Sequence, residues 1–141
     1  MKLSAREQYG LRAMIELARR YGRGPVSLND VAQAQGISFP YLEQIVPLLK
    51  DAGLIESTRG AYGGYVLSRG PQAITIGDII RALEEGHIIP LKCISGVEVR
   101  DPCARQEICT ARDVWRRMHD GIVEVLDSTT LADLIEPVRV G

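Results

Sequence analysis

The chain has 141 residues, which suits one domain or a small domain with an appended element. Apolar residues make up 45% and charged residues 25%, as expected for a globular protein with a packed core, and this excludes wholesale disorder. No apolar run approaches the roughly 20 residues needed to span a bilayer. The N-terminus lacks the apolar stretch of a signal peptide, so we expect a cytoplasmic protein with no membrane partner.

Charge is distributed unevenly along the chain, although the formal net charge is only −1. Residues 1–72 hold nine Lys/Arg and six Asp/Glu, a net of +3, whereas residues 73–141 hold eight and twelve, a net of −4. A basic front half and an acidic back half indicate that one half binds a polyanion and the other half has another task.

The front half contains three predicted helices. The first begins at a capping box formed by Ser4 and the glutamate three residues later, and it ends near residues 21–22. A short second helix is expected within residues 26–36, where a glycine closes it. A third helix spans residues 38 to about 52, and Pro47 is expected to bend it.

A β-hairpin follows these helices. Residues 54–58 and 65–68 are its predicted strands, and Arg-Gly-Ala-Tyr-Gly-Gly at residues 59–64 forms a glycine-rich tip. Glycines at a hairpin tip allow the backbone to approach another surface closely. A Walker-type phosphate loop is excluded, because no Gly-Lys-Ser/Thr follows. Three short helices and a hairpin are typical of a winged helix-turn-helix, with its turn at Gly36-Ile37.

In that motif the third helix enters the major groove of DNA with its N-terminal residues at the base edges. There Gln44 can pair with adenine and Glu43 can accept a hydrogen bond from cytosine. Arg59, at the base of the wing, can enter a minor groove or contact a phosphate. The alternative is that these residues form only the solvated face of an amphipathic domain. The candidate DNA-binding residues are Ser38, Tyr41, Glu43, Gln44, Arg59, Gly60 and Tyr62, and the candidate phosphate contacts are Arg12, Arg19, Arg20 and Lys50.

The back half contains a fourth predicted helix at residues 75–85, a long helix ending near residue 127, and a final turn or two at residues 130–135. Apolar residues spaced by four and three along the long helix form a heptad seam. This seam favours dimerisation, although it could instead pack against the first helix of the same chain. The seam consists of Ala111, Trp115, Met118, Ile122 and Val125.

Three cysteines, Cys93, Cys103 and Cys109, lie in a segment with no clear periodicity. In the cytoplasm they are expected to be free thiols or metal ligands rather than disulfides. A single free cysteine is usually a small buried apolar residue, but three together favour zinc or an iron–sulfur cluster. The C-x9-C-x5-C spacing has no C-x-x-C pair, which disfavours structural zinc, whereas iron–sulfur clusters tolerate wider spacing.

Several motifs resemble one known family of regulators. They are PYLEQI at residues 40–45, AGLI at residues 52–55, and the glycine-rich wing at residues 59–65. These motifs resemble the family of the iron–sulfur regulator IscR, whose relatives include the nitric-oxide sensor NsrR, the iron regulator RirA and the cysteine regulator CymR. The resemblance covers essentially the whole chain. It implies a homodimeric winged-helix transcription regulator, with repression as the expected output, that binds a partly palindromic operator. It also places the family's base-reading positions at Ser38, Tyr41, Glu43 and Gln44 and its wing contact at Arg59.

The resemblance also implies a cofactor. Cluster-binding members of the family use three cysteines in the same loop, so Cys93, Cys103 and Cys109 are the expected ligands of a [2Fe–2S] or [4Fe–4S] cluster that senses iron–sulfur, redox or nitric-oxide status. Arg112 stands where IscR has a histidine, and the fourth ligand is unassigned. Gln8, a poor ligand, aligns with the acidic ligand of the nitric-oxide sensors and lies beside Glu7. His87 and His119 are weaker candidates, and a small thiol or water is a further alternative. The alternative is a family regulator without a cluster, sensing cysteine or redox status through thiols, zinc or a protein partner.

Together these features predict a mainly α fold with a small β-hairpin wing. Residues 1–72 are expected to form the winged helix-turn-helix DNA-binding domain, and residues 73–141 to supply dimerisation helices with a cysteine-containing sensor loop at about residues 87–109. An enzyme is not expected, because the sequence offers two histidines, no recognisable pair of carboxylates and no nucleophile motif.

Overall fold

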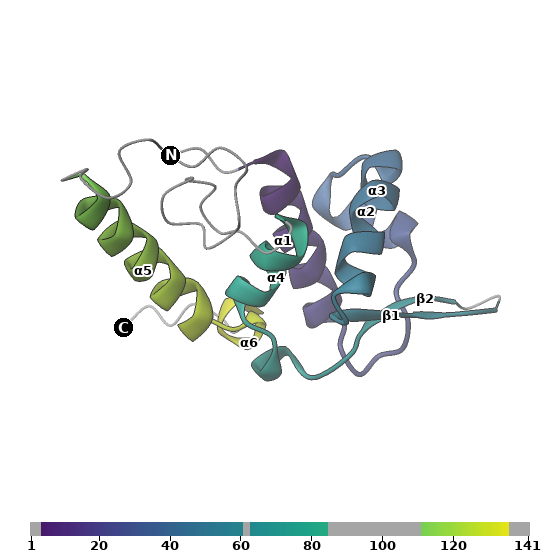
Figure 1. The fold of residues 1–141 in the computed structure, drawn as a ribbon. Helices are drawn as coiled ribbons and strands as arrows, with labels where there is room; N and C mark the ends of the chain where they lie inside the picture. The colour runs from purple at the N-terminus through teal and green to yellow at the C-terminus, as the bar shows by residue number, and fades with distance from the viewer. Residues whose placement is uncertain (1–3, 61–62, 85–110, 136–141) are drawn as a thin grey trace.

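The computed structural model describes residues 4–60, 63–84 and 111–135. Helix α1 lies in the middle of the molecule, with α2 and α3 on one side and α4 on the other (Figure 1). A two-stranded hairpin projects beyond the helices on the α3 side, and the long helix α5 lies at the opposite end. The described elements are α1 (Ala5–Arg19), α2 (Leu28–Gln35), α3 (Phe39–Asp51), β1 (Ile55–Thr58), β2 (Gly64–Leu67), the 3-10 helix η1 (Pro71–Ala73), α4 (Ile76–Leu83), α5 (Arg112–Ser128) and α6 (Leu131–Ile135).

Short-range capping sets where the helices begin. The Ser4–Glu7 capping box is present, with the Glu7 backbone N–H donating to Ser4 Oγ at 3.1 Å and the Ser4 N–H donating to Glu7 Oε2 at 3.2 Å. Ser27 and Ser38 are the N-caps of α2 and α3, and each Oγ accepts a hydrogen bond from the backbone N–H three residues later. Helix α1 ends at Arg19, about two residues before the predicted boundary. Helix α3 continues through Pro47, which lies on its exposed side, where water can bond to the carbonyl that proline leaves unpaired.

The hairpin is attached to the helices at its base. Strands β1 and β2 pair antiparallel with Ile55 opposite Leu67, and both of these side chains are buried. Tyr65 of β2 also forms a bridge with Val26, through N–H to carbonyl bonds of 3.0 and 2.9 Å. The base of the wing is therefore fixed to the segment between α1 and α2, whereas the described strands extend beyond the helices (Figure 1).

One continuous hydrophobic core joins the front of the chain to its back. It contains residues of α1, α2 and α3, and it extends through Ile79 and Leu83 of α4 to Leu131 of α6. The backbone of α1 approaches α4 closely at Gly10, where a Cβ atom would collide with the side chain of Leu83. The division into domains at residues 72 and 73 stays a prediction, and the core packs on both sides of it.

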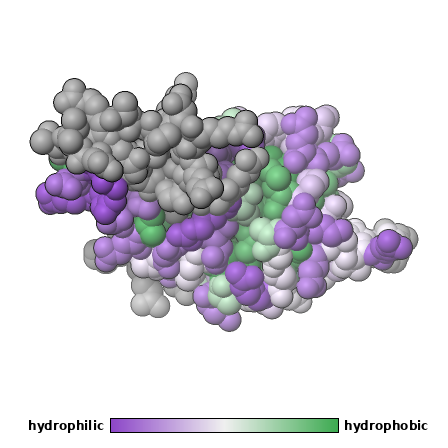
Figure 2. Space-filling view, viewed as in Figure 1, coloured by the Kyte–Doolittle hydropathy of each residue, from purple (hydrophilic) through white to green (hydrophobic). Residues whose placement is uncertain are grey.

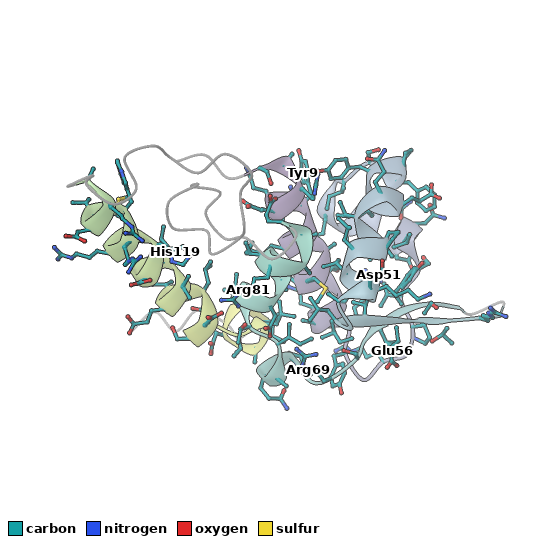
Figure 3. All side chains as sticks on the ribbon, viewed as in Figure 1. Tyr9, Asp51, Glu56, Arg69, Arg81 and His119 are labelled. Carbon is teal, nitrogen blue, oxygen red and sulfur yellow. The ribbon has the colours of Figure 1, made fainter. Side chains whose placement is uncertain are left out.

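Helix α5 is held to the rest of the molecule by α4 and by its own C-terminal end. Arg81 donates two hydrogen bonds of 2.7 Å to the carboxylate of Asp127, and Figure 3 shows Arg81 on the side of α4 that faces α5. The backbone N–H of Ile76 donates to the Thr129 carbonyl at 2.9 Å. No residue of α5 is buried in the described part of the chain. The heptad seam does not pack against α1, because Trp115, Met118 and Val125 remain 40%, 44% and 63% exposed.

The Arg81–Asp127 pair predicts an acid dependence of stability. Hydrogen bonding from Arg81 lowers the pKa of Asp127. A lowered carboxyl pKa adds stability above the ordinary aspartate pKa, and this stability is lost as the pH falls through the lowered value. Asp127→Asn should therefore cost stability at pH 7, by less than about 1 kcal/mol because both side chains are partly exposed, and the difference from wild type should shrink below about pH 4.

Urea unfolding at pH 7 and pH 3.5 measures this difference. Asp51→Asn, at an exposed position of α3, is the control for loss of one carboxylate. An Asp127→Asn variant with the wild-type midpoint at both pH values would show that the pair adds nothing to folding.

Candidate nucleic-acid interface

The recognition helix of the predicted winged helix-turn-helix is α3. Four of its side chains, Leu42, Ile45, Val46 and Leu49, are buried in the core and fix the rotation of the helix about its axis. This rotation leaves Glu43 and Gln44 exposed and available to a ligand.

Two further candidates lie at the start of α3. Ser38 is the N-cap, and its Oγ accepts a hydrogen bond from the Tyr41 backbone N–H at 3.5 Å. Tyr41 is half-buried, and its ring packs edge-on against the ring of Tyr9 in α1. Ser38 is therefore occupied as a helix cap, and Tyr41 has a ring contact that the sequence does not indicate. Glu43 and Gln44 are the exposed candidates for reading bases.

Arg59 and Gly60 follow the last residue of β1 and lie at the far end of the hairpin, so the prediction that Arg59 lies at the base of the wing is wrong. Arg59 and Gly60 are both exposed, and Figure 2 shows hydrophilic side chains at the end of the projecting hairpin. Gly60 has a φ of 115°, a conformation that favours glycine, and its carbonyl accepts a bond from the Gly63 backbone N–H at 3.0 Å. Tyr62, the remaining predicted wing residue, lies outside the described residues.

Helix α3 and the wing lie on the same side of the molecule, away from α5 (Figure 1). Gly53, with a φ of 76°, turns the chain from α3 directly into β1. Ser68 Oγ then donates to the Gly53 carbonyl at 2.6 Å, which ties the returning strand to this turn. The exposed side chains of α3 and of the wing are thus held in a fixed relation and can contact one ligand together.

The four candidate phosphate contacts have different surroundings. Arg20 pairs with Glu16 at 3.4 Å and with Asp30 at 3.9 Å, and Arg19 lies 4.0 Å from Glu16. Arg12 donates to the Gln35 backbone carbonyl. Lys50 is exposed near the end of α3. Glu16, which is only 7% exposed, was not predicted from the sequence, although its spacing of four residues from Arg20 is a usable signal.

The predicted sensor residues Cys93, Cys103 and Cys109 lie outside the described residues, as does His87. Within the described ranges, no three His, Cys, Asp or Glu side chains are grouped so that they could hold a metal ion. Three thiolates match the ligand chemistry of an iron–sulfur cluster, so the cysteines remain the candidate ligands.

Two of the candidate fourth ligands have other partners. Glu7 belongs to the capping box of α1, and burial together with the nearby Glu84 raises the pKa of its carboxyl. His119 of α5 lies 3.3 Å from Asp120 through its Nδ1 atom (Figure 3 shows its place on the helix). These contacts favour neither residue as a ligand.

The sequence matches the Rrf2 family, described as iron-dependent transcriptional regulators, over residues 3–137. The chain belongs to this family. It is 51% identical over 134 residues to the transcriptional regulator CymR of Bacillus subtilis, an alignment that spans 95% of this chain and 89% of that protein.

Two solved structures resemble the fold closely. CymR, described as the global cysteine regulator of B. subtilis, matches with a TM-score of 0.75 at 48% identity, over 95% of both chains. IscR of T. potens matches with a TM-score of 0.76 at 42% identity, over 96% of this chain and 86% of that one. These matches confirm the predicted family and the winged-helix fold. Rrf2 proteins are transcription regulators that bind DNA rather than enzymes, as the sequence indicates, and no described helix of this chain is long and apolar enough to cross a membrane.

Proposed function

We propose that this Rrf2 regulator acts in the cytoplasm as a homodimer that binds a partly palindromic operator and represses transcription. Each subunit inserts the N-terminal half of α3 into the major groove, where Glu43 and Gln44 face the base edges, and Arg59 of the wing contacts the adjacent backbone or minor groove. The observation that supports this most directly is the joint exposure of these three side chains from two elements held in a fixed relation.

Selection of binding sites from a random DNA pool tests the proposal. We expect an enriched sequence with two related half-sites, and an affinity that falls steeply as salt rises, because phosphate contacts release counterions. A purified protein that enriches no sequence and binds no DNA at low salt would refute the DNA-binding role.

Replacing Glu43 by alanine should change specificity more than affinity. A carboxylate that accepts a hydrogen bond from a cytosine discriminates one base pair by about 1–3 kcal/mol. We therefore expect Glu43→Ala to relax the preference at one position of each half-site, measured with single-base variants of the selected site. Equal losses of affinity for selected and random DNA would contradict base reading by Glu43.

Replacing Arg59 by alanine should have the opposite signature. A phosphate or minor-groove contact adds affinity to most sequences, so we expect weaker binding to selected and random DNA alike. The slope of log affinity against log salt should fall by about 0.9 for each phosphate that is no longer neutralised. Arg59→Lys, which keeps the charge, should recover most of the slope, and an unchanged slope in Arg59→Ala would remove Arg59 from the interface.

The dimer proposal rests on the apolar face of α5. A shallow groove on this helix is lined by Met118, Gly121, Ile122, Val125 and Leu126, and its exposed lining is almost wholly apolar. Such a face is costly to leave in water. The same face of a second copy can bury it, because a two-fold axis places equivalent apolar residues opposite each other. A two-fold dimer also matches the symmetry of a palindromic operator.

We further propose that the cysteine segment is the sensor and holds an iron–sulfur cluster through Cys93, Cys103 and Cys109. The three thiolates and the relationship to IscR support this. When bound, such a cluster would make the regulator responsive to iron supply, oxidants or nitric oxide. The segment leads into α5, so a change there can alter the dimer and the spacing of its two recognition helices.

A second candidate is sensing of cysteine status without a cluster. The 51% identity to CymR, whose structure is described as that of a global cysteine regulator, favours it. Anaerobic purification followed by measurement of iron, acid-labile sulfide and the visible spectrum separates the two. We expect iron and sulfide in the wild type and neither in a variant with all three cysteines replaced by alanine. A colourless wild-type protein that holds no iron after reconstitution would refute the cluster and favour sensing through thiols, zinc or a protein partner.

A further inference from the structure

Helix α1 presents Tyr9, Arg12 and Glu16 on one face, since they are spaced by three and four residues. Tyr9 lies where α1 faces α3 (Figure 3). The edge of its ring meets the ring of Tyr41, with ring centroids 5.5 Å apart and planes at 77°. The guanidinium of Arg12 lies 5.5 Å from the centroid of the same Tyr9 ring. Tyr9 is thus packed between a cation of its own helix and a side chain of the recognition helix.

The same guanidinium binds the end of α2. Arg12 Nη2 donates to the backbone carbonyl of Gln35, the last residue of α2, and Arg12 Nε lies 3.4 Å from Gln35 Oε1. Carbonyls in the last turn of a helix have no partner within the helix, and a cation there also complements the helix dipole. Gln35 Nε2 in turn donates to Glu16 Oε2 at 3.3 Å, so α2 is held to α1 through two side chains.

The position of these contacts matters because the turn between α2 and α3 is short. Only Gly36, with a φ of 63°, and the buried Ile37 separate the end of α2 from the N-cap of α3. The angle between the two helices therefore depends on what holds their neighbouring ends. Arg12 holds the end of α2, and through Tyr9 it supports the first turn of α3 at Tyr41.

We propose that Arg12 and Tyr9 are positioning residues for DNA recognition, which fix the angle at which α3 presents Glu43 and Gln44 to the bases. The inference rests on the proposed DNA-binding function. It assigns Arg12 a role different from the phosphate contact that its charge alone indicates. A phosphate contact needs only a positive charge, whereas this junction needs the planar guanidinium, which can stack on a ring and donate in a fork.

Arg12→Lys and Arg12→Met separate the two roles. For a positioning residue, both variants should lose about tenfold in the ratio of selected-site to random-DNA affinity, with an unchanged salt slope and unchanged random-DNA affinity. For a phosphate contact, Arg12→Lys should bind DNA as the wild type does. Arg12→Met should bind both the selected site and random DNA more weakly, and its slope of log affinity against log salt should be smaller in magnitude by about 0.9. Arg23→Met, which removes an exposed cation of the loop after α1, is the control for charge.

Tyr9 provides an independent pair of variants. Tyr9→Phe keeps the ring and should retain the wild-type preference for the selected site. Tyr9→Leu removes the ring between Arg12 and Tyr41 and should lose preference about as much as Arg12→Lys. Retained binding to random DNA shows that each variant is folded, because an unfolded protein would lose both affinities.

The outcomes are distinct. A wild type that prefers no DNA sequence refutes the proposed function itself. A wild type with a clear preference, together with an Arg12→Lys or Tyr9→Leu variant that keeps it, overturns this inference and leaves the proposed function intact. Loss of preference in Tyr9→Phe equal to that in Tyr9→Leu would also overturn it, because the ring would then not be the group that matters.

Discussion

Replacing Gly121 by glutamine is expected to weaken the proposed dimer by about 100-fold or more while the monomer stays folded. Gly121 lies within the apolar groove of α5, and no atom lies within 4 Å of the place where its Cβ would be. The monomer therefore has room for a side chain, and removing a helical glycine favours the helix by about 0.5 kcal/mol. In a symmetric dimer the same side chain enters the interface twice. Overpacking at about 1–3 kcal/mol for each copy then weakens association by roughly 3 kcal/mol or more.

Sedimentation equilibrium measures the dissociation constant, and thermal unfolding of the isolated variant reports on the monomer. Glu124→Gln places the same side chain at an exposed position three residues away, outside the groove, and should leave the dimer intact. Operator affinity should fall with the loss of the dimer, because a monomer contacts only one half-site. A Gly121→Gln protein that dimerises as the wild type does would show that the groove is not the interface between subunits.

Replacing Gly64 by alanine is expected to cost about 3 kcal/mol of folding stability and to release the wing. Gly64 begins β2, where the strand crosses the segment between α1 and α2. An added Cβ would collide with the carbonyl of Val26 and lie 2.9 Å from the backbone nitrogen of Ser27. Because both obstacles are backbone atoms, no change of rotamer can make room. The strand must therefore move and lose its two hydrogen bonds with Val26. The loss of folding free energy combines the overpacking at the new Cβ with the loss of these two hydrogen bonds.

Urea unfolding measures the decrease in stability, and DNA binding measures the release of the wing. The salt slope of Gly64→Ala should fall to that of Arg59→Ala, and the double variant should show no further fall, because a displaced wing no longer brings Arg59 to the DNA. Ser57→Ala, at an exposed position of the paired strand β1, is the control and should leave the folding stability nearly unchanged. A Gly64→Ala protein with wild-type stability would mean that the bridge at Val26 is loose enough to yield.

Features decided within a few residues were predictable from the sequence. The capping residues Ser4, Ser27 and Ser38 each accept a hydrogen bond from the backbone N–H three positions later. Because both partners are close in the sequence, the start of each of these helices can be predicted from the sequence. The glycine-rich hairpin follows in the same way from the change of period and the turn residues between its strands. Helix α5 and its apolar seam could also be predicted, because the spacing of apolar residues along a helix is a local property of the sequence.

Contacts between distant residues could not be predicted, because they depend on how the helices pack. Arg12 looks like a free cation in the sequence, and only the packing of α1 beside α2 brings it to the carbonyl of Gln35. Arg81 meets Asp127 because α4 and α5 lie side by side. In the sequence Gly64 looks like an ordinary turn glycine, and only the structure shows that the Val26 backbone leaves no room for a Cβ atom there.

The sequence by itself therefore determined the family, the order of the elements and the residues exposed on the recognition helix and wing. The family was indicated by the resemblance of motifs such as PYLEQI at residues 40–45. The order of the elements and their exposed faces follow from local hydrogen bonds and from a periodic apolar pattern, which act over one or two turns. The tertiary structure decided which polar residues hold the helices at their angles and which glycines allow backbones to cross. Those roles depend on separations of 23 to 46 residues along the chain, for Arg12 with Gln35 and Arg81 with Asp127, and only the packing of the core brings such residues together.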